Sequence, residues 1–379
     1  MTRPDRPKQQ AVVFWFAHQP GDETHIAETM ARWADHGINA IYWQPRYVGV
    51  GLYRSRVVAP FDEQIEKLWM EGTADFEVTQ GHREFARDMA EHLRRFDPYE
   101  VAMREAKRRG LRFIAQTSLF DRWFPLLPDR FFEQHPQCLL VDRTGKFYFP
   151  GLPCYAEPAT QDYCLAEIRE LVQLGAEGIS LDMISHQVGY WPEELGAPQP
   201  DTLGFNRPLV DEYQRRYSVD VLREDFDKAK WHDLHGECLT GFLRRVKEAI
   251  GDLPLIAGAT PQGFLGYGGK AGNVVNPNYA AQSPACRINL PWRKWLAEGI
   301  VDALRVYAEP PSDVADVEVM KRSIDRGEIY FARETAREED AGEYRRQLHE
   351  VRRGILDGYV LHEAAFFQGK PKMWGIFEP

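Results

Sequence analysis

Short apolar runs recur along the whole chain, and segments with helical periodicity separate them. A glycine often stands near the end of a helical segment, just before the next apolar run, as at Gly37, Gly110 and Gly299. Glycine is common just after a helix because it adopts positive φ without steric strain. Such alternation is typical of βα units and therefore of a parallel sheet. No other feature of the sequence restricts the fold as strongly.

Eight apolar runs can be counted, and we expect each one to form a strand. In chain order they are Ala11–Ala17, Asn39–Gln44, Leu111–Ser118, Gly178–Ile184, Leu253–Ala259, Val301–Ala308, Glu328–Arg333 and Asp357–His362. A series of eight βα units predicts an α/β fold of the closed (β/α)8 barrel type. No glycine-rich phosphate-binding motif follows the first run, which disfavours a dinucleotide-binding fold.

The length of the chain also fits one barrel. Its 379 residues exceed the usual barrel core of about 250 residues and leave roughly a hundred for long βα loops. We therefore expect a single catalytic barrel domain over residues 1–379. Its largest insertion should follow the fourth strand, at about residues 185–208.

Composition excludes several classes of protein. The net charge is −10, from 47 Lys and Arg against 57 Asp and Glu, with no basic patch of the kind that binds nucleic acid. The N-terminal segment lacks the apolar core of a signal peptide, and no apolar stretch is long enough to span a bilayer. Five cysteines without a CxxC pair indicate free thiols in a reducing compartment. We expect a soluble cytoplasmic protein with neither nucleic acid nor a membrane as a partner.

The carboxyl ends of the strands are where barrel enzymes place their catalytic residues. Asp182 is the clearest candidate, because it interrupts an apolar fourth strand, where an ionised carboxylate must be paired or functional. Further acidic residues follow the sixth, seventh and eighth strands: Glu309, Glu334 and Glu363. Glu309 precedes two prolines, which should hold its backbone extended and its side chain in a constant direction.

The candidate substrate-binding residues are polar or aromatic and lie at or beyond the strand ends. They are His18, Trp43, Gln44, Arg46, Gln116, Trp123, His186, Trp191, Arg333 and His362. Aromatic faces stack on sugar rings, while Gln, His and Arg side chains bind sugar hydroxyls. Carboxylates at four strand ends, with aromatic residues nearby, therefore favour a neutral polyhydroxy substrate. We expect Trp123 and Trp191, which lie in long loops, to line its cleft.

The segment Gly178–His186 and the sequence after it resemble a family of glycoside-hydrolase-like barrels. In that family a fourth strand ending in Leu-Asp precedes a Gly-aromatic-Asn-x-Pro segment, a Glu-Tyr-x-x-Arg-Tyr helix and a Val-Asp turn. The matching residues here are Gly204–Asn206, Pro208, Glu212–Tyr217 and Val219-Asp220. The segment from Arg32 to Ser55 also matches. The resemblance covers most of the chain and implies a barrel that hydrolyses glycosidic bonds.

The end of the fourth strand separates this chain from one large group of such enzymes. The retaining clan that includes the xylanases carries Asn-Glu there, whereas this chain has Leu181-Asp182. An Asp at that place, with an acidic residue after the sixth strand, is instead similar to the arrangement in α-galactosidases and α-fucosidases. That similarity implies that Asp182 is the nucleophile or transition-state stabiliser and Glu309 the general acid/base, with Glu334 and Glu363 in reserve. It implies an oligosaccharide, polysaccharide or glycoside substrate, no cofactor and no metal.

Two other classes of function stay open at this point. A carbohydrate-binding barrel without catalysis would pair its strand-end carboxylates with Arg46, Arg305 or Arg333. A metal-dependent hydrolase or isomerase would bind its metal through His18, His186 and His362. Metal-dependent barrels typically place an HxH pair on the first strand, and this chain has only His18 there.

Overall fold

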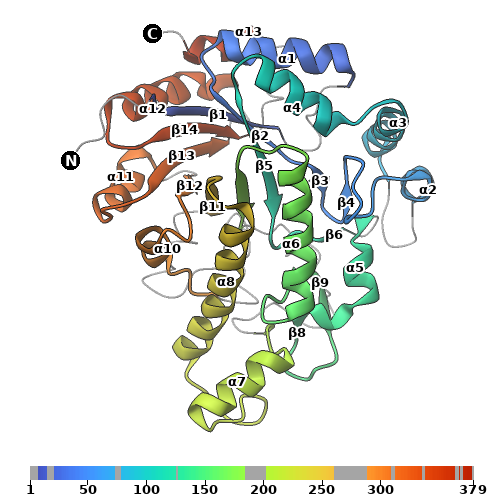
Figure 1. Cartoon of the computed structure of the whole chain (residues 1–379), viewed down its shortest axis with the longest axis vertical. Coiled ribbons are helices and arrows are strands. Elements are labelled where there is room, and N and C mark those ends of the chain that lie inside the picture. Colours follow the sequence, from blue (N-terminus) through green and yellow to red (C-terminus); the bar gives the residue numbers. More distant parts are fainter. Residues whose placement is uncertain are drawn as a thin grey trace.

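The computed structural model describes residues 7–14, 21–72, 78–124, 127–183, 202–259, 288–308, 312–334, 338–362, 367 and 370–377. Eight parallel strands close into a barrel in the order β1-β14-β13-β12-β11-β10-β5-β2 (Figure 1). Their bounds are β1 Gln9–Phe14, β2 Ala40–Trp43, β5 Arg112–Ser118, β10 Ile179–Asp182, β11 Leu255–Ala259, β12 Ala303–Tyr307, β13 Glu328–Glu334 and β14 Gly358–His362. Each of the eight predicted runs contains or overlaps one of these strands, so the predicted (β/α)8 barrel is confirmed.

Each strand presents alternate side chains to the barrel interior and to the surrounding helices. The apolar part of the interior consists of Ala11, Val13, Ala40, Tyr42, Ile114, Ile256, Ala303, Tyr307, Tyr330, Ala332 and Val360. Side chains of the opposite parity, such as Phe113 and Leu181, belong to the larger core between strands and helices. The interior also holds polar side chains, because Gln116 and Arg305 are buried there.

Helices surround the barrel, and α6 and α8 run side by side on its outer surface (Figure 1). The helices are α1 Glu23–Asp35, α2 Glu63–Glu71, α3 Gln80–Arg95, α4 Pro98–Arg108, α5 Arg130–Gln134, α6 Pro158–Gln173, α7 Arg207–Tyr217, α8 Lys228–Ile250, α10 Trp292–Glu298, α11 Val314–Arg322, α12 Ala341–Arg353 and α13 Pro371–Trp374. Many begin after an aspartate that accepts a hydrogen bond from a first-turn amide, as Asp22 does for α1 and Asp227 for α8. Among the described helices, none combines the length and the apolar character that crossing a membrane requires.

Three short antiparallel hairpins lie in the loops after β2 and β5, and the sequence did not predict them. They pair β3 Arg46–Tyr47 with β4 Val50–Gly51, β6 Trp123–Phe124 with β7 Leu127–Pro128, and β8 Leu139–Val141 with β9 Tyr148–Pro153. The first hairpin packs with α2 and α3 around a small separate core that includes Val50, Ile65 and Trp69.

Candidate active site

Asp182 is the last residue of β10 and lies at the carboxyl end of the barrel. Its side chain is 14% exposed, so it is mostly enclosed but reaches the surface. The backbone of Asp182 is in register with Ser118 of β5 and with Gly258 of β11. A carboxylate fixed to a strand between two paired neighbours has a well-defined position, which catalysis requires.

Two donors from β12 bind the Asp182 carboxylate. Its Oδ2 atom accepts from Nη2 of Arg305 at 3.2 Å and from the hydroxyl of Tyr307 at 3.1 Å. Arg305 and Tyr307 are two residues apart on one strand, so both side chains face the same way. A neighbouring positive charge and hydrogen bonds to the carboxylate both favour its ionised form. The Asp182 carboxylate at the barrel mouth is therefore paired with a buried cation and accepts a hydrogen bond from a hydroxyl group.

Tyr307 also connects Asp182 with the last barrel strand. Its hydroxyl oxygen lies 3.3 Å from Nδ1 of His362, the final residue of β14. Burial holds the pKa of Tyr307 well above its usual value, and the Asp182 charge adds to this against the opposing effect of Arg305. A neutral tyrosine has one hydroxyl proton. When that proton is donated to Asp182, His362 must donate from Nδ1 to the tyrosine oxygen.

Arg305 lies inside the barrel beneath this group and is completely buried. Besides Asp182, its guanidinium donates from Nη1 to Oε1 of Gln116 on β5 at 2.5 Å. The guanidinium carbon lies 5.3 Å from the ring centre of Tyr42 and 4.7 Å from that of Tyr307. The described site thus draws on five strands: β2, β5, β10, β12 and β14.

Of the predicted site residues, the structure brings together Asp182, Gln116 and His362. The sequence predicts Arg305 only as a carboxylate partner in the non-catalytic alternative, and Tyr307 is not among the predicted site residues. A signal for both was present in the sequence. Arg305 and Tyr307 occupy alternate positions of an otherwise apolar run, Ala303–Tyr307, whose alternation predicts that they share a face.

Two predicted substrate-binding residues, Trp43 and Gln44, lie at the end of β2, and for Gln44 that role stays a prediction. Trp43 is buried in the core outside the barrel, against Phe14 at 5.4 Å and Phe113 at 6.2 Å between ring centres. Strand alternation turns its side chain outward. Gln44, the next residue, is buried, and its backbone amide donates to the Phe14 carbonyl at 3.1 Å. The prediction that Trp43 binds substrate was therefore wrong.

Two predicted arginines also lie outside the barrel interior. Arg46 is buried in ion pairs with Asp129 at 2.7 Å and with Glu167 at 3.0 Å. Arg333 donates to the Ala308 carbonyl at 2.8 Å and lies 3.5 Å from Glu343 of α12. Both guanidinium groups thus hold loops and helices against the barrel. Burial in ion pairs gives Arg46 a structural role in place of the predicted one, whereas substrate binding by Arg333 stays a prediction.

For the remaining predicted residues, the structure describes either nothing or the backbone alone. His18, His186, Trp191, Glu309 and Glu363 fall in segments that the structure does not describe. For Trp123 and Glu334 only the backbone is described; Glu334 ends β13 in register with His362. Within the described ranges, no three His, Cys, Asp or Glu side chains form a group that could hold a metal ion. Of the three histidines of the metal alternative, the description covers His362 only.

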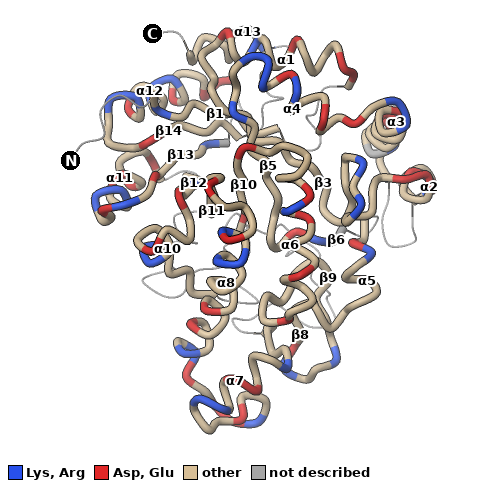
Figure 2. The backbone as a smooth tube through the Cα atoms, viewed as in Figure 1, with Lys and Arg blue, Asp and Glu red and all other residues tan. Residues whose placement is uncertain are grey.

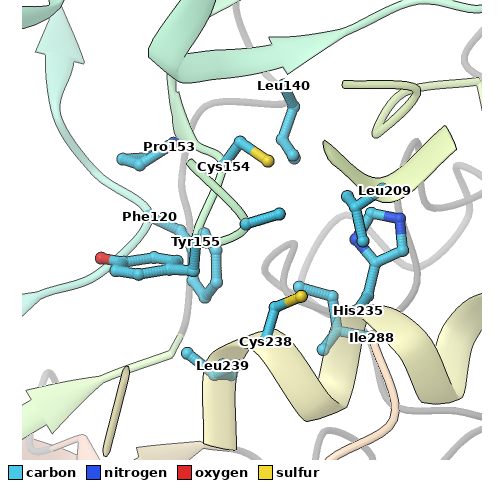
Figure 3. A pocket seen from close by; sticks show the side chains of 11 residues that line it. Phe120, Leu140, Pro153, Cys154, Tyr155, Leu209, His235, Cys238, Leu239 and Ile288 are labelled. Atoms are coloured by element: carbon cyan, nitrogen blue, oxygen red, sulfur yellow. The ribbon is translucent and has the colours of Figure 1, made fainter. Parts of the chain in front are cut away.

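A small cavity lies beside α8 (Figure 3). Mostly apolar side chains line it, together with Cys154, His235 and Cys238. It has room for about one water molecule, too little for a sugar ring. Burial raises the pKa of Cys238 to about 11, so this thiol is protonated near neutral pH.

Solved structures with a similar fold include several glycoside hydrolases. The PgaB (BpsB) glycoside hydrolase domain from Bordetella bronchiseptica is 14% identical, with 98% of each chain covered and a TM-score of 0.63. The β-amylase catalytic domain from Paenibacillus polymyxa is 8% identical over 93% of this chain and 92% of its own, with a TM-score of 0.54. The endo-1,4-β-mannanase from Rhizomucor miehei is 9% identical over 95% and 87%, with a TM-score of 0.51. No protein-family model and no curated protein matches the sequence.

Proposed function

We propose that this protein is a glycoside hydrolase whose reaction centre is Asp182. The observation that carries the proposal is a partly exposed carboxylate at the carboxyl end of a closed barrel, held by Arg305 and Tyr307. This end of a barrel is where catalytic residues lie in enzymes of this fold. The similar barrels from Bordetella, Paenibacillus and Rhizomucor are a glycoside hydrolase domain, a β-amylase and a mannanase. The substrate would be a glycoside, an oligosaccharide or a polysaccharide.

The reaction would follow the two-carboxylate scheme of most glycoside hydrolases. One ionised carboxylate attacks the anomeric carbon or stabilises the oxocarbenium-like transition state, while a second, protonated carboxyl group protonates the leaving oxygen. Asp182 suits the first role, because Arg305 and Tyr307 both stabilise its ionised form. A site of this kind needs neither a metal ion nor an organic cofactor.

We assign the second carboxyl group to Glu309. It follows Tyr307 by two residues in the sequence, so the strand that holds Tyr307 against Asp182 leads directly to it. The prolines at 310 and 311 restrict the backbone there. Glu334 and Glu363 are the reserve candidates, and the register of Glu334 with His362 supports keeping Glu334 in that role.

The Asp182–Arg305 ion pair is also what a non-catalytic carbohydrate-binding barrel would contain. Such a protein would bind sugars at the same end of the barrel without hydrolysing them. The two functions differ in turnover, so a panel of aryl α- and β-glycosides and oligosaccharides separates them. Saturable binding with no hydrolysis of any panel member would favour the binding protein.

The decisive variant is D182N, assayed on the substrate that the panel identifies. Asn is nearly isosteric with Asp, so we expect an unchanged thermal midpoint and a turnover lower by several orders of magnitude. D162N is the matched control: Asp162 lies on α6 with a side chain 66% exposed, paired with Arg245 outside the barrel. It should retain full turnover. Near-normal turnover of purified D182N would show that Asp182 is not the reaction centre.

A further inference from the structure

We infer that Arg305 is a positioning residue that keeps the Asp182 carboxylate ionised and oriented, and that Gly258 provides the space it needs. The inference rests on the proposed function of Asp182 for its catalytic meaning. The contact itself, in which the Arg305 guanidinium passes over β11 to reach the Asp182 carboxylate, rests on the geometry alone.

The three residues lie in one row across the barrel wall. Asp182 of β10, Gly258 of β11 and Arg305 of β12 are in register on adjacent strands. Asp182 and Arg305 are therefore separated by the strand that carries Gly258. Their side chains nevertheless meet, with Nη2 of Arg305 at 3.2 Å from Oδ2 of Asp182.

Gly258 leaves the gap through which this contact is made. A Cβ atom at that position would lie 2.9 Å from Nη2 and 3.2 Å from Nε of Arg305, and 3.4 Å from Oδ1 of Asp182. Glycine weakens the interior of a strand, so its presence there often marks the close approach of another group. Here that group is the Arg305 side chain. Because the atoms nearest to that Cβ belong to side chains and not to the backbone, a methyl group at 258 should displace the guanidinium and weaken its contact with Asp182 without unfolding the barrel.

The remaining contacts of Arg305 hold its guanidinium in a fixed orientation. Gln116 on β5 accepts a hydrogen bond from its second terminal nitrogen, and the rings of Tyr42 and Tyr307 lie within cation–π distance. A fully buried cation is strongly unfavourable unless it is paired. Asp182 is the carboxylate that pairs with it in the described part of the chain. The two charges therefore stabilise each other at the base of the site.

The pairing predicts a specific pH dependence. Arg305 and Tyr307 face Asp182 directly, and His362 is joined to it through Tyr307. Tyr307 is neutral, so Arg305 supplies the positive charge that opposes protonation of Asp182. Without that charge Asp182 should take up a proton at higher pH. The acid limb of the kcat/KM profile should then move upward.

The test compares R305M, R305K and G258A with the wild-type protein. We expect R305M to move the acid limb up by about one pH unit or more. R305K keeps the positive charge, so its acid limb should lie between those of R305M and the wild-type protein. G258A removes no charge and should move the acid limb upward by less than R305M does. The controls are R245M, which removes an arginine charge on α8, and G241A, where an added Cβ meets nothing within 4 Å. Both controls should leave the profile unchanged.

A second readout separates this inference from the proposed function. Carboxyl-¹³C aspartate labelling, with the Asp182 signal assigned by its loss in D182N, follows the protonation of Asp182 without any substrate. An upward-shifted titration in R305M and G258A supports the inference even if D182N proves fully active, an outcome that would defeat only the proposed function. Unchanged titration and unchanged acid limbs would overturn the inference while leaving the proposed function intact. If R305M does not fold, G258A carries the same test.

Discussion

The Tyr307 hydroxyl contacts both Asp182 of β10 and His362 of β14, and it therefore connects these two strands within the described site. Y307F removes one hydrogen bond to a charged group and keeps the ring that packs in the barrel. A hydrogen bond of this kind corresponds to a factor of about 10 to 100 in rate if it acts in the transition state. We therefore expect kcat/KM to fall by about that factor with little change in thermal midpoint. Kinetics identical to wild type would show that the Tyr307 hydroxyl has no role in turnover.

A second group of charged residues is buried outside the barrel, around Glu167 of α6. Glu167 Oε2 lies 3.0 Å from Arg46 and 2.6 Å from Arg122, and Arg46 also pairs with Asp129 at 2.7 Å. These side chains are at most 2% exposed. They connect the loop after β2 with the loop after β5 and with α6, which explains the burial of Arg46.

E167Q should therefore destabilise the protein strongly. It leaves two buried guanidinium groups without their shared charge, a change that typically lowers the free energy of unfolding by about 3 to 5 kcal/mol. Urea denaturation measures the loss. The control is E91Q, whose exposed partner is Arg95 on the same helix and whose effect should stay within about 0.5 kcal/mol. Equal unfolding free energies for the two variants would contradict the structural role of Glu167.

Position along a strand was sufficient to single out three residues that the structure brings together. Asp182 stood out as an acid in an apolar run, and Gln116 and His362 stood at strand ends. Trp43 was misassigned because it lies one residue away from an inward-facing position, next to Tyr42. A shift of one residue reverses the face, and the sequence does not fix the parity of each strand independently.

At the scale of single elements, α11 begins with a capping box. Asp313 accepts from the first-turn amide of Val314 and donates its own amide to Asp316. Burial raises the pKa of Asp313, but hydrogen bonds from the Val314 amide and the Arg346 guanidinium outweigh it and leave the pKa below its usual value. The ionised cap therefore stabilises the folded state above the usual aspartate pKa, and this contribution is lost as pH falls through the lowered pKa.

D313N tests this pH dependence, because Asn remains a good N-cap and only the charge is removed. We expect the variant to unfold with a free energy lower by at most about 1 kcal/mol at pH 6, since Asp313 and Arg346 are both partly exposed. The difference should shrink below about pH 4 and vanish in more acidic solution. Urea unfolding at a series of pH values measures it. A difference that grows toward low pH would contradict a lowered pKa for Asp313 in the folded state.

The eight barrel strands could be predicted because each is an apolar run bounded by turns. The hairpins β3–β4, β6–β7 and β8–β9 could not, because five of their six strands have only two or three residues, too few to show alternation. Long-range contacts fix them instead: a Cβ atom at Gly49 would lie 2.1 Å from the Leu127 carbonyl oxygen. The turn between β3 and β4 thus packs directly on β7, a contact that no local pattern encodes.

Over the whole molecule, charges of both signs are interspersed along the outer helices (Figure 2). Inside the barrel, by contrast, polar and charged side chains contact one another in a series. Near the amino ends of the strands Gln9 donates to the Tyr42 hydroxyl at 2.7 Å, and Arg305 lies over the Tyr42 ring. Arg305 then reaches Asp182 at the opposite end. Polar contacts therefore extend along the barrel axis and end at the proposed reaction centre.

A crystal structure of D182N with the glycoside found in the panel screen tests the central claim most directly. We predict a sugar ring at the carboxyl ends of the barrel strands, with its anomeric carbon beside the side chain at position 182. A glutamate carboxyl group, that of Glu309 in our proposal, should lie within about 10 Å of that side chain, across the glycosidic bond. A glycoside bound away from the strand ends, with position 182 contacting no sugar atom, would contradict Asp182 as the reaction centre.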